Sequence, residues 1–331
     1  MGMSGLTLGK FAPFHKGHQL LVETALAECD AVTCLIYDSP EVTPIPLAVR
    51  AGWIRTLYPR LRVIEARNGP SEVGDTKAIQ HAHEAYVLNG LGIRQVDRFY
   101  SSERYGGHMS RALGAFDRRV DEERAVVPVS GSAIRSDPFA HRWFLHPLVY
   151  RDHVTTAVFL GAPCTGKTTL AERLARELGT VWMPEYGRDY WTRHQVDHRL
   201  SPEQLLEIGQ GHLEREDEGI MEARRFFFVD TNALTTVVFA RYYHGAPDPR
   251  LLAIAASCTS RYDLVFLCAD DFAHQDTWDR SGPANRSRVQ RMVVLDLEAR
   301  GIRALPLRGP IESRTAVVHE TLAGYRKWGK A

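Results

Sequence analysis

The sequence lacks the features that mark a membrane, secreted or disulfide-stabilised protein. No apolar run approaches the roughly 20 residues that a helix needs to cross a bilayer. The N-terminal segment has neither the charged start nor the long apolar core of a secretory signal. The five cysteines form no C-x-x-C pair and are odd in number. These absences predict a cytoplasmic protein with reduced thiols and no membrane partner.

An excess of charge of one sign is also missing. Forty-one Lys and Arg balance forty Asp and Glu, for a formal net charge of +1. A general nucleic-acid binder normally carries a clear basic excess, so we expect no nucleic-acid partner. The balance still allows basic clefts for small phosphorylated ligands, and the sequence leaves open whether the chain forms a homo-oligomer.

The sequence does contain enough apolar residues for two cores. With 331 residues, 44% of them hydrophobic, it predicts two domains. Short apolar runs alternate with helical patterns in both halves, which is typical of parallel α/β sheets. We place the boundary near Arg151, which gives domains of residues 1–150 and 151–331. The predicted strands are Leu6–Phe11, Ala31–Tyr37, Arg62–Ala66, Val96–Tyr100, Ala125–Val129, Thr155–Leu160, Arg225–Asp230, Leu264–Cys268 and Arg303–Leu307.

A His-x-Gly-His turn follows the first predicted strand. His15 and His18 stand three residues apart where a helix begins, so both imidazoles can face one phosphate. Gly17 lets a nucleotide approach the backbone, and Lys10 can add a charge. Metal binding is the competing interpretation, but no third ligand stands at a supporting spacing.

A second polar turn stands near the end of this half. Hydroxyls and N–H groups at a helix start suit phosphate oxygens, and Arg135 adds a bidentate fork. Ser132 could equally be a simple N-cap. Ser101, after another strand, could hold ribose or adenine or only form a turn. The predicted ATP contacts of this half are Gly9, Lys10, Phe11, His15, Gly17, His18, Ser101, Ser130, Ser132 and Arg135.

The second half begins with a strand, a G-x-x-x-x-G-K-T loop and a helix, which is the P-loop in its required context. Backbone N–H groups of such a loop surround the β-phosphate, Lys167 reaches the β- and γ-phosphates, and the Thr168 hydroxyl holds Mg²⁺. The phosphate-binding residues that it predicts are Gly161, Ala162, Pro163, Cys164, Thr165, Gly166, Lys167, Thr168 and Thr169.

Acidic, aromatic and arginine residues follow later strands of this half. Asp230 ends a strand, where it can hold Mg²⁺ or accept a proton from an attacking hydroxyl, or simply cap a helix. Glu185 is a second candidate for that role. Residues 276–291 are rich in arginine and predict a lid over ATP. The predicted lid and substrate contacts are Arg280, Arg286, Tyr186, Arg188 and Tyr190.

These motifs resemble those of known families. The segment GKFAPFHKGH resembles the H-x-G-H motif of nucleotidyltransferases, which attack the α-phosphate of ATP on a Rossmann-like sheet. Together with VSGSAIRSDPF, GAPCTGKTT, PEYGRDY and FVDTNALTT, it resembles the NadR family over nearly all of the chain. That family joins a nicotinamide-nucleotide adenylyltransferase to a ribosylnicotinamide kinase. Some members carry an N-terminal helix-turn-helix that represses transcription; because the first strand starts near Leu6, we expect no such activity here.

The resemblance implies a function in NAD salvage, with ATP and Mg²⁺ as cofactors and nicotinamide riboside, nicotinamide mononucleotide (NMN) and NAD as ligands. His15, His18, Arg135, Lys167, Asp230 and Glu185 would be catalytic. A cationic pyridine ring favours an aromatic face, for which Trp53 and Trp278 are the candidates. Two alternatives remain: a fused phosphopantetheine adenylyltransferase and dephospho-coenzyme A kinase, and a ligand-sensing regulator without turnover.

Overall fold

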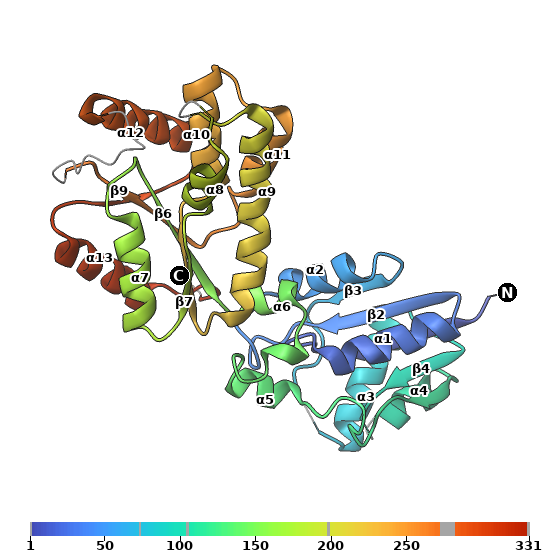
Figure 1. Cartoon of the computed structure of the whole chain (residues 1–331). Coiled ribbons are helices and arrows are strands. Elements are labelled where there is room, and N and C mark those ends of the chain that lie inside the picture. Colours follow the sequence, from blue (N-terminus) through green and yellow to red (C-terminus); the bar gives the residue numbers. More distant parts are fainter. Residues whose placement is uncertain (1, 73, 104–105, 197–198, 272–281, 330–331) are drawn as a thin grey trace. The chain divides into compact units, whose positions relative to one another are not determined.

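The computed structural model describes residues 2–72, 74–103, 106–196, 199–271 and 282–329, without the side chains of residues 282–284. The chain divides into two compact units (Figure 1). Unit 1 runs from the N-terminus to Asp152 and includes the segment that starts at Trp328, whereas unit 2 is His153–Lys327. Each unit contains a parallel sheet, so the predicted fold class is confirmed. In the described part of the chain, no helix has the length and apolar character that crossing a membrane requires.

Unit 1 has the strand order β3-β2-β1-β4-β5, all parallel. Residues of α4 and of the π-helical turn Tyr86–Gly90 pack on one face with Leu6, Leu35 and Phe99. The elements of this unit are β1 (Ser4–Gly9), α1 (Lys16–Glu28), β2 (Ala31–Tyr37), α2 (Leu47–Leu57), β3 (Arg62–Ala66), α3 (Lys77–Ala85), β4 (Arg98–Ser101), α4 (Gly107–Ala112), β5 (Phe116–Arg119), α5 (Gly131–Ser136) and α6 (Pro147–Arg151).

The strand that we predicted at Ala125–Val129 is wrong. That segment is a loop, in which the Asp121 carboxylate accepts from the backbone N–H groups of Val126 and Val127 at 2.9 Å each. The strand that pairs with β4 is instead β5, whose sequence Phe-Asp-Arg-Arg is mostly charged. As an edge strand it needs only its backbone to pair, and its Phe116 is 63% exposed. An apolar pattern therefore does not reveal it.

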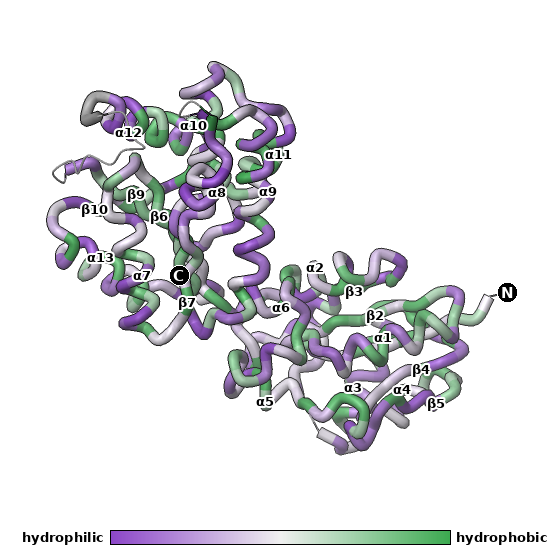
Figure 2. Tube along the Cα trace, viewed as in Figure 1, coloured by the Kyte–Doolittle hydropathy of each residue, from purple (hydrophilic) through white to green (hydrophobic). Residues whose placement is uncertain are grey.

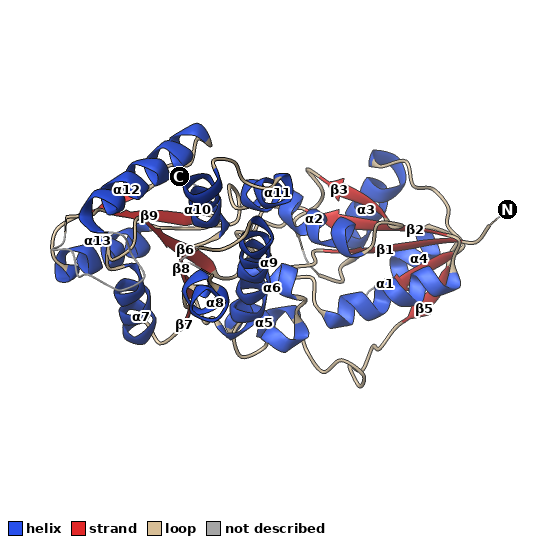
Figure 3. Cartoon of the chain, turned by 45° about the horizontal axis from the view of Figure 1, so that its top comes forward, coloured by secondary structure: helices blue, strands red, loops and turns tan. Residues whose placement is uncertain are grey.

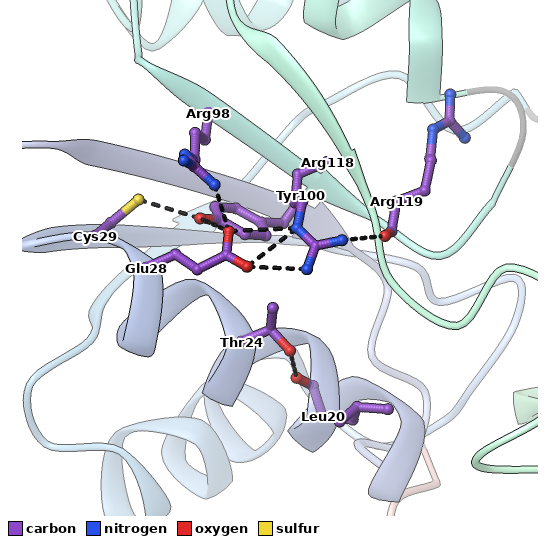
Figure 4. A network of polar contacts seen from close by, with 8 residues as sticks. All are labelled: Leu20, Thr24, Glu28, Cys29, Arg98, Tyr100, Arg118 and Arg119. Atoms are coloured by element: carbon purple, nitrogen blue, oxygen red, sulfur yellow. Dashed lines mark hydrogen bonds and ion pairs between the residues drawn. The ribbon is translucent and has the colours of Figure 1, made fainter.

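A polar cluster fastens α1 to the β4 and β5 side of the sheet, at the opposite end of the helix from His15 (Figure 4). The Glu28 carboxylate pairs with Arg98 at 2.6 Å and with Arg118 at 2.9 Å, and it accepts from the Tyr100 hydroxyl at 3.1 Å. The Arg118 hydrogen bond is the largest cause that keeps the pKa of Glu28 below its usual value. The cluster stabilises the fold and lies apart from the phosphate sites described below.

Unit 2 has the strand order β10-β9-β6-β8-β7, also parallel. Helices α7 and α13 pack on one face over Phe159, Phe228 and Phe266, and helices cover the other face too (Figure 3). Its elements are β6 (Thr155–Leu160), α7 (Lys167–Glu177), β7 (Val181–Met183), α8 (Tyr186–His194), α9 (Pro202–Gly219), β8 (Phe226–Asp230), α10 (Ala233–His244), α11 (Pro249–Ser257), β9 (Leu264–Cys268), α12 (Gly282–Ala299), β10 (Leu305–Leu307) and α13 (Ile311–Gly324).

Both sheets are buried and apolar along their inner strands. Figure 2 shows hydrophobic residues along β2 and β6, and the Val158, Phe159 and Leu160 side chains of β6 are at most 1% exposed. Strands covered on both faces read as continuous apolar runs. This is why the sequence predicted β2, β6 and β9 with the bounds that the structure shows; the edge strand β3 also has its predicted bounds.

Candidate nucleotide sites

Each unit has its candidate site where the central strand ends. In unit 1 the chain leaves β1 for β2 on one side and later returns to β4 on the other. In unit 2, β6 lies between β8 and β9. Helices following such neighbouring strands diverge, and ligands of open α/β sheets bind in the crevice between them. His15 follows β1 and the P-loop follows β6, so both motifs stand at these positions.

In unit 1, His15 and His18 form the N-cap of α1. The Nδ1 atom of His15 accepts from the Gly17 N–H at 3.2 Å, and the Nδ1 atom of His18 accepts from the His15 N–H at 3.3 Å. Their rings stack with centroids 3.8 Å apart. In each ring Nδ1 is an acceptor, so the neutral tautomer carries its proton on Nε2.

Both imidazoles are neutral. Burial, with a contribution from Arg124, lowers the pKa of His15 to about 4. Burial and the neighbouring His15 lower the pKa of His18 well below its ordinary value, against a hydrogen bond to the Pro13 carbonyl that raises it. At neutral pH the pair therefore adds no positive charge; the Nε2–H of His15 can donate to a phosphate oxygen, and that of His18 can do so once it leaves the Pro13 carbonyl.

Arg135 supplies a positive charge beside this turn. Its Nη1 atom donates to the Ala12 carbonyl at 2.6 Å and its Nη2 atom to the Ser132 hydroxyl at 3.0 Å. The cap of α5 is Ser130, whose Oγ accepts from the Ala133 N–H at 3.1 Å. The N-cap alternative for Ser132 is therefore wrong, and the structure brings Arg135 from a distant segment to the His15–His18 turn.

The other residues predicted to contact ATP in unit 1 have different surroundings. Phe11 is buried edge-on to His18, and a Cβ on Gly9 would stand 3.3 Å from the Phe11 ring. The Lys10 ammonium pairs with Glu41 at 2.7 Å. Ser101 ends β4 and its hydroxyl donates to the Glu103 carbonyl at 3.3 Å.

The prediction that Trp53 contacts the pyridine ring needs correction. Its side chain lies in α2 and is only 2% exposed, and its indole N–H donates to the Asp152 carboxylate at 2.7 Å. With its ring in the core, Trp53 has no open face for a pyridine ring, so we withdraw that assignment. The other candidate, Trp278, lies outside the described residues, as does Arg280.

Sequence reasoning missed the role of Arg50, although one signal of it was present. This arginine is 0% exposed, and its guanidinium donates to the carbonyls of Lys10, Tyr37 and Ile45. These carbonyls lie at or beyond the ends of β1 and β2, so Arg50 holds that end of the sheet together. The signal of this role was an arginine among the apolar residues of the segment that forms α2.

In unit 2 the P-loop has the close approaches that its glycines predict. Gly161 has a φ of +139°, and a Cβ there would stand 2.6 Å from the Cys268 carbonyl oxygen. Gly166, with a φ of +79°, is the N-cap of α7. The Lys167 ammonium, 6% exposed, donates to the Ala162 carbonyl at 2.8 Å. The loop is thus a tight turn around its own lysine.

The Thr168 and Asp230 side chains meet beside the P-loop. The Thr168 hydroxyl donates to Oδ2 of Asp230 at 2.5 Å, and Asp230 is 0% exposed. Within the part of the chain that the structure describes, Oδ1 of Asp230 is buried without a hydrogen-bond partner. Burial and the nearby Glu185 raise the pKa of Asp230 to about 6, although Lys167 lowers it. A buried carboxylate oxygen without a donor beside a hydroxyl fits an oxygen-preferring cation such as Mg²⁺.

Three further residues brace the P-loop from α12 and α13. Gln290 accepts from the Ala162 N–H at 2.7 Å and donates to the Cys268 carbonyl at 3.0 Å. Fully buried Arg314 donates to the Thr165 carbonyl at 3.0 Å, and Arg286, one of the predicted lid arginines, donates to the Cys164 carbonyl at 3.1 Å. Sequence reasoning missed Gln290 and Arg314, because it searched for phosphate ligands near the loop.

Helix α8 divides the predicted substrate residues between two faces. Glu185 precedes the helix and pairs with Arg188 at 3.1 Å. Tyr186 stacks under the Arg215 guanidinium at 3.5 Å, and the Tyr190 hydroxyl bonds to Glu207, so both tyrosines face α9. The two tyrosines do not line the pocket beside the P-loop, and the prediction of substrate contact is corrected for them. At helical spacing from Gly187 and Arg188, Trp191 faces the pocket instead.

The pocket opens between the P-loop, α8, α9 and α10. Glu185 and Arg188 supply its charges, and aromatic and aliphatic side chains form much of its wall. Its lining residues are Pro163, Glu185, Gly187, Arg188, Trp191, Leu200, Leu205, Ile208, His212, Thr231, Thr235, Thr236, Phe239 and Tyr243. A mostly apolar pocket with a few buried polar groups is typical of a small-molecule site.

These features define an α/β protein with two parallel-sheet units, the second of which carries a P-loop nucleotide site. Residues 156–314 match the family model described as AAA domain. The trifunctional NAD biosynthesis/regulator protein NadR of Escherichia coli (strain K12) is 27% identical over 321 residues, which cover 90% of this chain and 77% of that protein. Its Salmonella typhimurium (strain LT2) counterpart is 26% identical over 283 residues, covering 80% and 68%.

A solved structure extends the likeness to three dimensions. A NadR protein in complex with NAD and AMP-PNP aligns with 98% of this chain and 98% of its own, with a TM-score of 0.55 and 19% identity. At that identity the match shows a common fold. Together with the sequence matches over most of the chain, it shows that this protein is similar to NadR proteins along nearly its whole length.

Proposed function

We propose that this chain is a bifunctional enzyme of NAD synthesis. Unit 2 transfers the γ-phosphoryl group of ATP to the 5′-hydroxyl of nicotinamide riboside and gives NMN and ADP. Unit 1 transfers the adenylyl group of a second ATP to NMN and gives NAD and pyrophosphate. The proposal is supported by the similarity to NAD biosynthesis proteins and by the chemistry of the two sites.

The observation that carries the kinase assignment is the buried Asp230 carboxylate beside the P-loop. It stands next to Thr168, and its neighbour Thr231 lines the pocket that would hold the nucleoside. Lys167 would release the Ala162 carbonyl and bind the β- and γ-phosphates instead. Mg²⁺, held by Thr168 and Asp230, would neutralise charge on those phosphates. Asp230 or Glu185 would accept the proton of the attacking hydroxyl.

In unit 1 the protein would position the two substrates and form no covalent bond to either of them. A phosphate oxygen of NMN forms a bond to the α-phosphorus of ATP, and the bond to the pyrophosphate oxygen breaks. The neutral His15 and His18 would donate hydrogen bonds to the triphosphate, and Arg135 would add the positive charge. A neutral donor stabilises developing charge without the cost of burying a cation.

Product analysis tests the proposal directly. The purified chain, incubated with nicotinamide riboside, ATP and Mg²⁺, is expected to form ADP and NMN first, then NAD and pyrophosphate. Dephospho-coenzyme A and phosphopantetheine, offered in parallel, are expected to remain unchanged. Turnover of those two compounds would favour the coenzyme A alternative. Binding of nicotinamide riboside without any product would favour a ligand sensor.

A further inference from the structure

The side-chain amide of Gln290 lies between β6 and β9 where the P-loop begins. The paired residues of these two strands end at Leu160 and Leu267. Just beyond this pair, Gln290 accepts from the Ala162 N–H at 2.7 Å and donates to the Cys268 carbonyl at 3.0 Å. The amide, on a side chain that is 8% exposed, thus takes the place that a peptide group would have between two strands.

The two partners of this amide determine its orientation. A backbone N–H only donates and a carbonyl only accepts, so Oε1 faces Ala162 and Nε2 faces Cys268. A carboxylate of the same shape could accept from Ala162 but could not donate to Cys268, and an apolar side chain could do neither. The contact therefore requires both groups of the amide.

Ala162 connects Gln290 to the lysine of the P-loop. The Ala162 N–H binds Gln290, whereas its carbonyl accepts from the Lys167 ammonium and the Thr165 hydroxyl, both at 2.8 Å. Ala162 is 0% exposed, so water does not replace a partner that it loses. A displacement of Ala162 moves the carbonyl that holds Lys167, and the ammonium moves with it.

Helix α12 contacts the P-loop a second time through Arg286. This arginine stands one turn before Gln290 and donates to the Cys164 carbonyl at 3.1 Å. Residues four apart on a helix lie on the same face, so one face of α12 contacts the loop at Ala162 and at Cys164. The loop backbone thus depends on a helix that is 128 residues away in the sequence.

Two roles for Gln290 have different consequences. If its amide only stabilises the fold, its loss lowers the free energy of unfolding and leaves phosphate binding by the folded protein unchanged. Because Ala162 binds both Gln290 and Lys167, the structure predicts that phosphate binding changes as well.

Resting on the proposed kinase function of unit 2, we propose that Gln290 is a positioning residue for phosphoryl transfer: its amide fixes Ala162 and thereby places Lys167 for the β- and γ-phosphates of ATP. In this role Gln290 touches neither ATP nor the riboside. Its loss should weaken phosphate binding and slow the transfer, while the KM for the riboside stays the same.

Gln290→Met in the full chain tests this inference, because methionine has a similar volume but cannot replace the two hydrogen bonds. We expect the affinity for AMP-PNP, measured by calorimetric titration, to fall by at least about tenfold. The kcat for nicotinamide riboside should fall by about 10- to 100-fold, with its KM unchanged. Gln290→Glu, assayed at pH 8 as a carboxylate, should also lose AMP-PNP affinity, because it keeps the shape but not the donor.

Gln210→Met is the matched control, because Gln210 is an exposed glutamine on α9. It should bind AMP-PNP and phosphorylate the riboside as the wild type does. Urea unfolding of each variant separates a change in stability from a change at the site.

The inference is overturned if both Gln290 variants, when folded, bind AMP-PNP with wild-type affinity, so that only their stability is lower. A raised KM for the riboside at unchanged kcat would also overturn it, because Gln290 would then act on the riboside. If the wild type binds AMP-PNP but phosphorylates no riboside, the proposed function is wrong, and the AMP-PNP affinities of the variants still test the positioning of Lys167.

Discussion

Several histidines of this chain are held neutral by burial, and this couples its stability to pH. His15 and His212 each have a pKa of about 4 in the folded chain, against 6.5 for a free imidazole. Below pH 6.5 the unfolded chain therefore binds protons that the folded chain does not. Because folding lowers the pKa of these histidines, the folded chain loses stability as pH falls from 6.5 towards 4.

For His212 the expected loss at pH 5 is about 2 kcal/mol in the free energy of unfolding, relative to neutral pH. His212→Leu removes the titrating group, so the variant should lose less stability than the wild type between pH 7 and pH 5. Urea unfolding of both proteins at the two pH values measures the difference. An equal loss in both proteins would show that His212 is already protonated or exposed in the fold.

The fold requires glycine at the start of the P-loop. Gly161 combines a φ of +139° with a Cβ position 2.6 Å from the Cys268 carbonyl, so any side chain pushes the loop away from β9. The Ala162 N–H and carbonyl, which Gln290 and Lys167 bind, would move with it. The geometry of the whole phosphate site thus depends on one close backbone approach.

Gly161→Ala is expected to weaken AMP-PNP binding by at least about tenfold, because it adds about 1–3 kcal/mol of strain at the loop. Gly179→Ala is the matched control: Gly179 also has a positive φ, +61°, but a Cβ there meets nothing within 4 Å. It should lower stability while AMP-PNP binding stays near the wild-type value. Equal binding by Gly161→Ala and the wild type would mean that the loop tolerates the displacement.

The two candidate sites stand in separate sheets, each at the end of its own central strand. Lys167 follows β6 in unit 2, and His18 follows β1 in unit 1. If each site binds its own ATP, as we propose, a change in one should leave the chemistry of the other intact.

Lys167→Ala should abolish riboside phosphorylation, because it removes the charge on the β- and γ-phosphates, while NAD formation from supplied NMN continues near the wild-type rate. His18→Ala should slow NAD formation by about two to three powers of ten and accumulate NMN from the riboside. Separate assays of NMN and NAD measure both effects. Loss of both reactions in a folded Lys167→Ala variant would indicate a single shared nucleotide site.

The sequence by itself determined the two parallel sheets, the inner strands and the H-x-G-H and P-loop turns. These depend on local signals: continuous apolar runs, glycines at tight turns and residues at helix starts. Only the tertiary structure showed that the charged segment β5 is a strand, because its backbone pairs with β4. It also showed that Arg135, Gln290 and Arg314 support loops far away in the chain, and that Trp53 belongs to the core. Such contacts, like the burial that keeps His15 and His212 neutral, arise between segments that no local pattern connects.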